Sequence, residues 1–204
     1  MRIAILVEGK TEMAFMPSLR SFLSSRLEQR MPRLDPKPYH GRIPKKDKLR
    51  RVVENYLDIN NYDAVIALTD VYTDSKKKDF EDAEDAKNQM RGWVGDNPKF
   101  HPHAAQYDFE AWLLPFWPTI QKLAKKHDKS APGAQPEQVN HNKPPSKHIK
   151  EMFELGKCRD SYVKPRDAKR ILEGKNLRDA AVVCPELKAF LNTILMLCDG
   201  ELIS

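Results

Sequence analysis

The sequence predicts an α/β fold in which helices flank a mostly parallel sheet, followed by a helical C-terminal portion. Two short apolar runs, residues 2–7 and residues 63–68, have the length and β-branched content of buried strands. A segment with helical spacing of apolar residues follows each run. Strands that alternate with helices in this way are typical of a parallel sheet covered by helices.

The first strand passes directly into the first helix. Residues 2–7 form an apolar run that ends at Glu8 and Gly9, and no small-residue cleavage site of a signal sequence follows. Gly9 permits a tight turn, and Thr11 is a suitable helix N-cap. Apolar residues at helical spacing predict the helix itself: Phe15, Met16, Leu19, Phe22, Leu23 and Leu27. Glu8 is therefore expected where a buried strand meets a helix N-terminus.

The alternation continues through the first half of the chain. The predicted elements are an extended or looped segment at 34–44, a helix at 49–57, a strand at 63–68, a helix at 80–93 and a weaker strand at 100–106. The extended segment is predicted because it holds three prolines and a glycine. The second strand is followed at once by Thr69 and Asp70.

Helices are predicted for most of the remaining chain. Asp108 is a suitable cap for a helix over residues 109–116. The stretch 128–146 is rich in Pro, Gln, Asn, Lys and Ser, which predicts a flexible loop. Further helices are expected near 146–156, 166–173 and 187–195. This pattern divides the chain into an α/β core, residues 1–117, and a helical portion, residues 118–204, packed on that core.

Composition favours a cytoplasmic protein without a membrane span. The three cysteines are far apart and odd in number, unlike a disulfide framework or a zinc knuckle. No apolar run approaches the roughly 20 residues that a membrane-spanning helix needs. The formal net charge of +6 is compatible with a polyanionic partner such as nucleic acid. The sequence also lacks the glycine-rich loops that bind nucleotides and the serine elbow of hydrolases.

Carboxylates gather after the two predicted strands. Glu8 ends the first strand and Glu12 follows one helical turn later, whereas Asp70 ends the second strand and Asp74 lies in the loop beyond. Parallel strands present their carboxyl ends at one edge, where chemistry collects. Oxygen ligands of this kind suit Mg²⁺ or Mn²⁺. The structural alternative is that such acids stabilise helix N-termini, although a buried strand-end carboxylate such as Glu8 is costly in that role.

Basic residues form two groups that suit phosphate contacts. The first group includes Arg42, Lys45 and Lys46 at the start of a predicted helix, and the second includes Lys164. A solvated helix face is an equally good interpretation of the first group. His101 and His103 can lie on one side of an extended segment, but no third metal ligand is evident near them. Three other histidines are expected at the surface: His127, His141 and His148.

Two segments carry a resemblance to known families. Residues 7–12, Val-Glu-Gly-Lys-Thr-Glu after a buried strand, resemble the first motif of Toprim domains. Residues 109–114, Phe-Glu-Ala-Trp-Leu-Leu, are similar to the family called domain of unknown function 4276, a Toprim-like group related to the RloB-type proteins. The tail pattern of that family also matches, at Tyr162, Lys164, Asn176, Leu177, Ala180, Cys184 and Pro185. Together these segments cover nearly the whole chain.

The resemblance implies a Toprim-like, Rossmann-like fold and, as in several relatives, metal-dependent nuclease activity in defence against mobile elements alongside an ATPase. Glu8 matches the catalytic glutamate of the first motif, and Asp70 matches the first acid of an Asp-x-Asp pair. The second position of that pair is Tyr72 instead of an acid, so Asp74 is the candidate replacement. Glu110 has two interpretations: a capping role with Asp108 near a helix start, which we favour, and a position that faces the acidic centre.

The predicted site residues are Glu8 and Asp70 as catalytic residues, Glu8, Asp70, Asp74 and Glu12 as ligands of Mg²⁺ or Mn²⁺, and Lys10, Arg42, Lys45, Lys46 and Lys164 as nucleic-acid contacts. The first functional hypothesis is a metal-dependent endonuclease on DNA or RNA, the effector of an ATPase-linked antiviral defence system. The second is a non-catalytic Toprim-like module that docks on a partner ATPase or on nucleic acid. Tyr72 is the feature that divides them, and a homodimer is compatible with either.

Overall fold

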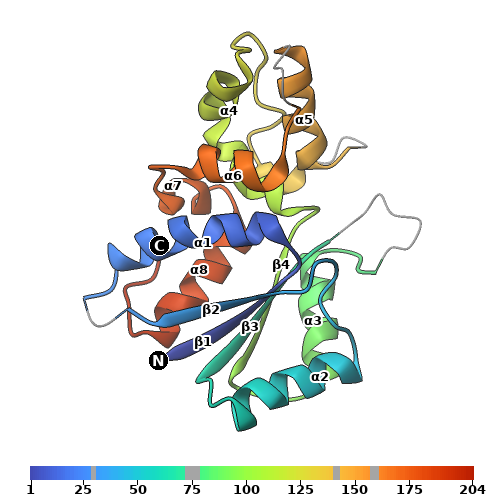
Figure 1. The fold of residues 1–204 in the computed structure, drawn as a ribbon, viewed down its shortest axis with the longest axis vertical. Helices are drawn as coiled ribbons and strands as arrows, with labels where there is room; N and C mark the ends of the chain where they lie inside the picture. The colour runs from blue at the N-terminus through green and yellow to red at the C-terminus, as the bar shows by residue number, and fades with distance from the viewer. Residues whose placement is uncertain (29–30, 72–78, 140–142, 157–160) are drawn as a thin grey trace.

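The computed structural model describes residues 1–28, 31–71, 79–139, 143–156 and 161–204, and it confirms the predicted α/β architecture. Four strands form one sheet in the order β2-β1-β3-β4 (Figure 1). These strands are β1 (Arg2–Val7), β2 (Arg33–Pro38), β3 (Ala64–Asp70) and β4 (Phe100–Ala105). Every neighbouring pair is parallel, so the carboxyl ends of the described strands share one edge of the sheet.

Helices cover both faces of the sheet (Figure 1). The elements of these two layers are α1 (Lys10–Ser24), α2 (Asp47–Glu54), the π-helical turn η1 (Asn55–Ile59), α3 (Ala83–Val94) and the C-terminal α8 (Pro185–Leu197). Helices α1 and α8 share one apolar core with the sheet, and α2 and α3 share the other. The last helix of the chain therefore returns to pack beside the first.

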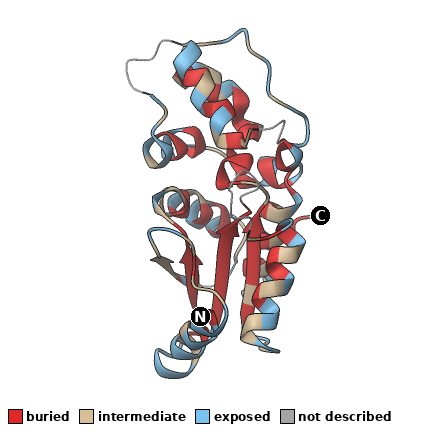
Figure 2. Cartoon of the chain, turned by 90° about the vertical axis from the view of Figure 1, so that its right-hand side faces the viewer, coloured by how far each residue is buried: buried red, intermediate tan, exposed pale blue. Residues whose placement is uncertain are grey.

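Alternation along β1 explains the two cores. Ile3, Ile5 and Val7 belong to the core shared with α1 and α8, whereas Ala4 and Leu6 belong to the core shared with α2 and α3. Successive side chains of a strand point to opposite faces. An uninterrupted apolar run is therefore what a strand covered on both faces requires. Figure 2 shows the resulting pattern, with buried central strands between helices that are buried on one side and exposed on the other.

A group of short helices lies beyond the carboxyl edge of the sheet (Figures 1 and 2). Its elements are the 3₁₀ helix η2 (Phe109–Phe116), α4 (Trp117–Ala124), the 3₁₀ turn η3 (Pro136–Gln138), α5 (Pro145–Leu155), α6 (Lys164–Leu172) and α7 (Leu177–Ala181). Helix α6 packs along α1, and η2 contacts α4, α5, α6 and α7. The predicted division between residues 117 and 118 falls at the start of α4, and it stays a prediction.

Two predicted elements take a different form. The segment predicted as extended or looped contains β2, because β2 lies at a sheet edge where Pro36 and Pro38 are tolerated. The helix predicted over residues 109–116 is a 3₁₀ helix, and Asp108 makes no side-chain cap to it. Pro115 lies inside this helix, and seven of its eight side chains are buried. Its form is thus set by packing on all sides more than by helical propensity.

The segment predicted as a loop at 128–146 contains η3, which places Glu137 in the interior. The indole Nε1 of Trp112 donates to Glu137 Oε1 at 2.8 Å. The backbone N–H groups of Glu186 and Leu187 donate to the same carboxylate at 3.0 and 3.2 Å. Glu137 therefore caps the N-terminus of α8 from a distant part of the chain.

The burial of the histidines agrees only in part with the prediction. His127 is exposed as predicted, but His148 is buried on α5, and His141 lies outside the described residues. His148 was wrongly placed at the surface because its flanking sequence is polar, while its helix packs against η2 and α4. His103 of β4 is buried against the ring of Phe190. Across the described residues, no helix is long and apolar enough to cross a membrane.

Burial of His103 predicts a loss of stability in acid. Desolvation, and then the charges of Lys87, His101 and Arg91, lower its pKa to about 3. The unfolded imidazole binds a proton near pH 6.5, so the unfolded state takes up more protons between these two pH values. Stability is therefore complete above pH 6.5 and falls as the pH drops, by about 2 kcal/mol at pH 5.

Urea denaturation at several pH values measures this effect. We expect His103→Gln, which keeps a hydrogen-bonding group but does not titrate in this range, to flatten the loss of stability between pH 6.5 and pH 5. An equally steep loss in wild type and variant would show that other groups cause the acid sensitivity.

Candidate functional site

Glu8 lies at the carboxyl end of β1 and binds the end of the neighbouring strand β3. Its side chain is 5% exposed. Glu8 Oε1 accepts hydrogen bonds from the Thr69 hydroxyl and, at 3.3 Å, from the Asp70 backbone N–H. The backbone carbonyl of Glu8 accepts from Gly41 N–H at 2.9 Å. The strand end, the adjacent strand and the loop after β2 together fix the position of this carboxylate.

Asp70 and Glu12 lie close to Glu8, as the sequence predicts for acids at adjacent strand ends. Glu12, in the first turn of α1, accepts from Gly9 N–H at 3.2 Å and so also stabilises the helix N-terminus. Burial raises the pKa of Glu12, and the charge of Glu8 adds to the effect. Burial raises the pKa of Asp70 still further above its usual value, with added contributions from Glu8 and Glu12.

Two further acids come from the segment after β4. Glu110 in η2 is 1% exposed, and Asp108 before it is also buried. Asp108 Oδ2 accepts from Ser146 N–H at 3.2 Å. Burial and the neighbouring Glu110 raise the pKa of Asp108 to about 7. Asp108 and Glu110 are also among the charges that raise the pKa of Asp70, so all five carboxylates act on one region.

Glu110, for which the sequence leaves both a capping role and a position facing the acidic centre open, lines the same pocket as Glu8. This acidic pocket has a volume of about 390 Å³. Its lining residues are Glu8, Gly9, Lys10, Thr11, Glu12, His40, Gly41, Asp70, Phe109, Glu110 and Lys164. Four of these are carboxylates, supplied by the ends of β1 and β3, the start of α1 and η2.

Lys164 of α6 supplies a counter-charge inside the acidic pocket. Its Nζ lies 3.1 Å from both carboxylate oxygens of Glu110. The Tyr162 hydroxyl donates to Glu110 Oε1 at 3.3 Å. Burial raises the pKa of Glu110, an effect that Lys164 opposes. Lys164, predicted to contact nucleic acid, is thus paired with a buried acid, although its side chain is still 46% exposed.

The other predicted basic residues lie around the acidic pocket or beside it. Lys10 is exposed and lines the pocket. Lys45 and Arg42 both pair with Asp79, and Glu8 is among the charges that act on the Lys45 ammonium. Lys46 is exposed at the N-terminus of α2. Cations are therefore present beside the carboxylates, as phosphate contacts at this edge would require.

The carboxylate oxygens of the acidic pocket suit a hard divalent cation such as Mg²⁺ or Mn²⁺ by their chemistry. A positive ion would also relieve the repulsion that raises the pKa values of these acids. Within the described ranges, no group of three or more His, Cys, Asp or Glu side chains is already arranged to hold a metal ion. Asp74, the fourth predicted ligand, and Tyr72 lie outside the described residues.

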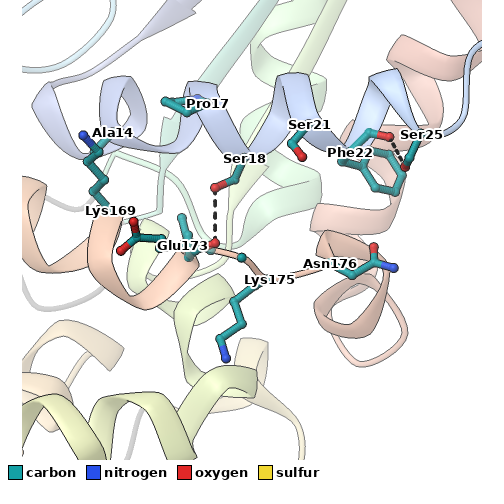
Figure 3. Close-up of a pocket in the computed structure, with 12 residues that line it drawn as sticks. Ala14, Pro17, Ser18, Ser21, Phe22, Ser25, Lys169, Glu173, Lys175 and Asn176 are labelled. Atoms are coloured by element: carbon teal, nitrogen blue, oxygen red, sulfur yellow. Dashed lines mark hydrogen bonds between the residues drawn. The ribbon is translucent and has the colours of Figure 1, made fainter.

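A second, larger pocket shares no residue with the predicted site. It measures about 480 Å³ and lies between α1 and the turn from α6 to α7 (Figure 3). Its lining includes Ser18 and Ser21 of α1 and, across from them, Lys169, Lys175 and Asn176. The Ser18 hydroxyl donates to the Leu172 carbonyl at 3.5 Å. Glu173 is the one carboxylate among its described lining residues. Size alone therefore does not identify the functional site in this protein, because the smaller pocket holds the clustered acids.

Comparison with known proteins agrees with the fold. A family model described as domain of unknown function (DUF4276) matches residues 7–195. The C-terminal region of the Burkholderia pseudomallei OLD protein has a similar structure, with a TM-score of 0.56 and 11% sequence identity over 97% of this chain and 98% of that chain. No curated protein matches the chain. The extent of the family match shows that the chain belongs to the DUF4276 family.

The ion pair between Lys164 and Glu110 predicts that removing the Lys164 ammonium lowers the stability of the fold. Lys164→Met leaves the buried carboxylate of Glu110 without its ammonium partner, which we expect to reduce the free energy of unfolding by about 1–2 kcal/mol, a value discounted for the exposure of Lys164. Urea denaturation near pH 7 measures this loss.

Replacing both partners, in Glu110→Gln with Lys164→Met, should restore most of the lost stability, because no charge is then left buried and unpaired. Equal losses in the single Lys164→Met variant and the double variant would show that Lys164 acts through packing and not through its charge.

Proposed function

We propose that this member of the DUF4276 family is a Mg²⁺- or Mn²⁺-dependent phosphodiesterase with a Toprim-like site, acting as an endonuclease on nucleic acid. The observation that carries the proposal is the acidic pocket, in which buried carboxylates from the ends of adjacent parallel strands meet an acid from η2. Such a cluster is expensive to bury, and a bound cation offsets the cost. The motif of residues 7–12 supports the Toprim-like assignment.

The basic residues beside the pocket support a polyanionic substrate. Lys10 opens onto the pocket, and Lys45 lies close enough to Glu8 to respond to its charge. With Arg42 and Lys46, these cations would hold the phosphates that flank a scissile bond, while the carboxylates stay at the centre. The net charge of +6 agrees with this division of roles.

In this proposal Glu8, Asp70 and Glu12 would hold the metal, with Asp74 as a further ligand. A bound ion would supply charge stabilisation at a phosphoryl oxygen and would increase the acidity of water. The contacts with Thr69 and the backbone of Asp70 orient the Glu8 carboxylate, which would position water or accept its proton. Lys164 balances Glu110 and limits the negative charge that the pocket must hold.

A second candidate is a non-catalytic module that docks on a partner ATPase or on nucleic acid. Two observations favour it: Tyr72 stands where the Toprim pattern has a second acid, and the described residues contain no complete three-ligand ion site. Three further proposals rest on the family resemblance. They are a cytoplasmic role in ATPase-linked antiviral defence, a relation to RloB-type proteins, and a homodimer.

Cleavage assays test the catalytic proposal. The purified protein, with Mg²⁺ or Mn²⁺, should cut plasmid DNA, single-stranded DNA or tRNA. Glu8→Gln and Asp70→Asn should each reduce the rate by about 100-fold or more, because each removes a charge needed at the reacting phosphate.

Glu54→Gln is the matched control for these variants, since Glu54 is an exposed acid at the end of α2. It should cleave like the wild type. Cleavage that survives in both Glu8→Gln and Asp70→Asn would contradict the assignment of the acidic pocket as the active site. Metal-dependent binding of nucleic acid without cleavage would favour the docking module.

Functional acids that repel one another should reduce stability in the absence of metal. Asp70 is 6% exposed, and the charges of four other carboxylates contribute to raising its pKa. We expect Asp70→Asn, measured by urea denaturation with chelator present, to increase the free energy of unfolding by about 1 kcal/mol. A large decrease would show that the Asp70 carboxylate stabilises the fold.

A further inference from the structure

A separate polar pocket lies at the outer edge of the sheet, on β4. It has a volume of about 270 Å³ and shares no lining residue with the acidic pocket. Its lining residues are Lys87 and Arg91 from α3, Phe100, His101, Pro102 and His103 from β4, and Ala189 and Thr193 from α8. Strand β4 is the last strand in the sheet order, so this pocket opens beside an edge strand. Two cations and two histidines thus meet between three elements.

Two imidazole nitrogens of this edge pocket are buried without a hydrogen-bond partner among the described residues: Nε2 of His101 and Nδ1 of His103. His103 is 6% exposed, so Nδ1 has little access to bulk water. A buried polar atom without a partner costs roughly 1–3 kcal/mol. Both histidines line the same pocket, and a ligand that reaches these two nitrogens would satisfy both.

The contact of His103 with Thr193 indicates what this ligand offers. His103 Nε2 lies 3.0 Å from Thr193 Oγ1. When the threonine hydroxyl donates to Nε2, the proton of the neutral imidazole resides on Nδ1, which then needs an acceptor. Lys87 and Arg91 are donors and cannot supply one. A ligand with acceptor oxygens completes this arrangement.

The charges around the edge pocket favour an anion over a metal cation. Lys87, His101 and Arg91 act on the His103 imidazole, and each lowers its pKa. Lys87 is paired with Glu84 and Glu186 at 2.9 Å, but neither carboxylate lines the pocket. The pocket therefore presents the positive ends of these pairs. A divalent metal would bind two histidines here only against two nearby cations.

We propose that the edge pocket binds a phosphate group, held by Arg91, Lys87 and the two free imidazole nitrogens. Since one water takes up about 30 Å³, the volume suits a phosphate with part of its hydration shell. The phosphate is either a free ion or part of a nucleic-acid backbone, and the recognition chemistry is the same for both. This site does not depend on the proposed nuclease activity, because it shares no residue with the acidic pocket.

Histidine side-chain NMR with added inorganic phosphate tests the proposal, at constant ionic strength maintained with chloride. We expect saturable shifts of the His101 and His103 ring signals. Arg91→Met should weaken phosphate binding about tenfold, because it removes a charge-assisted contact. Arg91 is 54% exposed, so this variant should fold normally. Lys99→Met, which removes an exposed positive charge just before β4, should bind phosphate within about twofold of the wild type.

A short DNA duplex in the same experiment distinguishes the two sources. Shifts of both rings that the duplex causes and Arg91→Met weakens assign the site to backbone phosphate, whereas shifts with inorganic phosphate alone assign it to a free ion. The Glu8→Gln variant should show the same phosphate-dependent shifts as the wild type. That result would show that phosphate binding at the edge pocket does not depend on the proposed nuclease site. The proposal is overturned if neither ligand moves the two ring signals, if Arg91→Met and Lys99→Met bind phosphate equally, or if only Zn²⁺ moves them.

Discussion

Burial of several like charges in one pocket is the constraint on which the site depends. Glu8 and Asp70 end adjacent strands whose apolar residues fill both cores, so the sheet holds their carboxylates near each other whatever the repulsion. The Thr69 hydroxyl and the Asp70 backbone N–H bind Glu8 directly and offset part of its desolvation. Strands this well buried supply a rigid support for a destabilised cluster, as is typical of functional sites.

The helical group beyond the carboxyl edge completes the pocket. Helix η2 brings Glu110 against the strand ends, and α6 brings Lys164 to neutralise it, 54 residues further along the chain. Helix α6 can do this because it packs along α1, which itself begins at the pocket with Glu12. The sheet and the helical group therefore contribute charges of both signs to one site. The pocket at the β4 edge has the opposite charge composition, because cations and histidines line it in place of acids.

Local pattern was sufficient to predict the strands that position the site. The apolar runs that became β1 and β3 predicted that Glu8 and Asp70 would meet at one edge, and the structure brings them together. The sequence left the role of Glu110 open between capping a helix and facing the acidic centre, because only the placement of η2 and α6 shows that it lines the pocket with Glu8 and pairs with Lys164. The capping of α8 by Glu137 depends likewise on contacts across about 50 residues. Such contacts leave no periodic signal in sequence.

The most direct test of the central claim is the melting temperature as a function of Mn²⁺ concentration, in wild type and in Asp70→Asn. A cation that binds only the folded acidic pocket stabilises it by about 2.7 kcal/mol at 100 times its dissociation constant. For a chain of this length the melting temperature should then rise by roughly 5–10 °C. The account predicts this saturable rise in the wild type and its loss in Asp70→Asn. A melting temperature that does not respond to Mn²⁺, or that rises equally in both proteins, would contradict it.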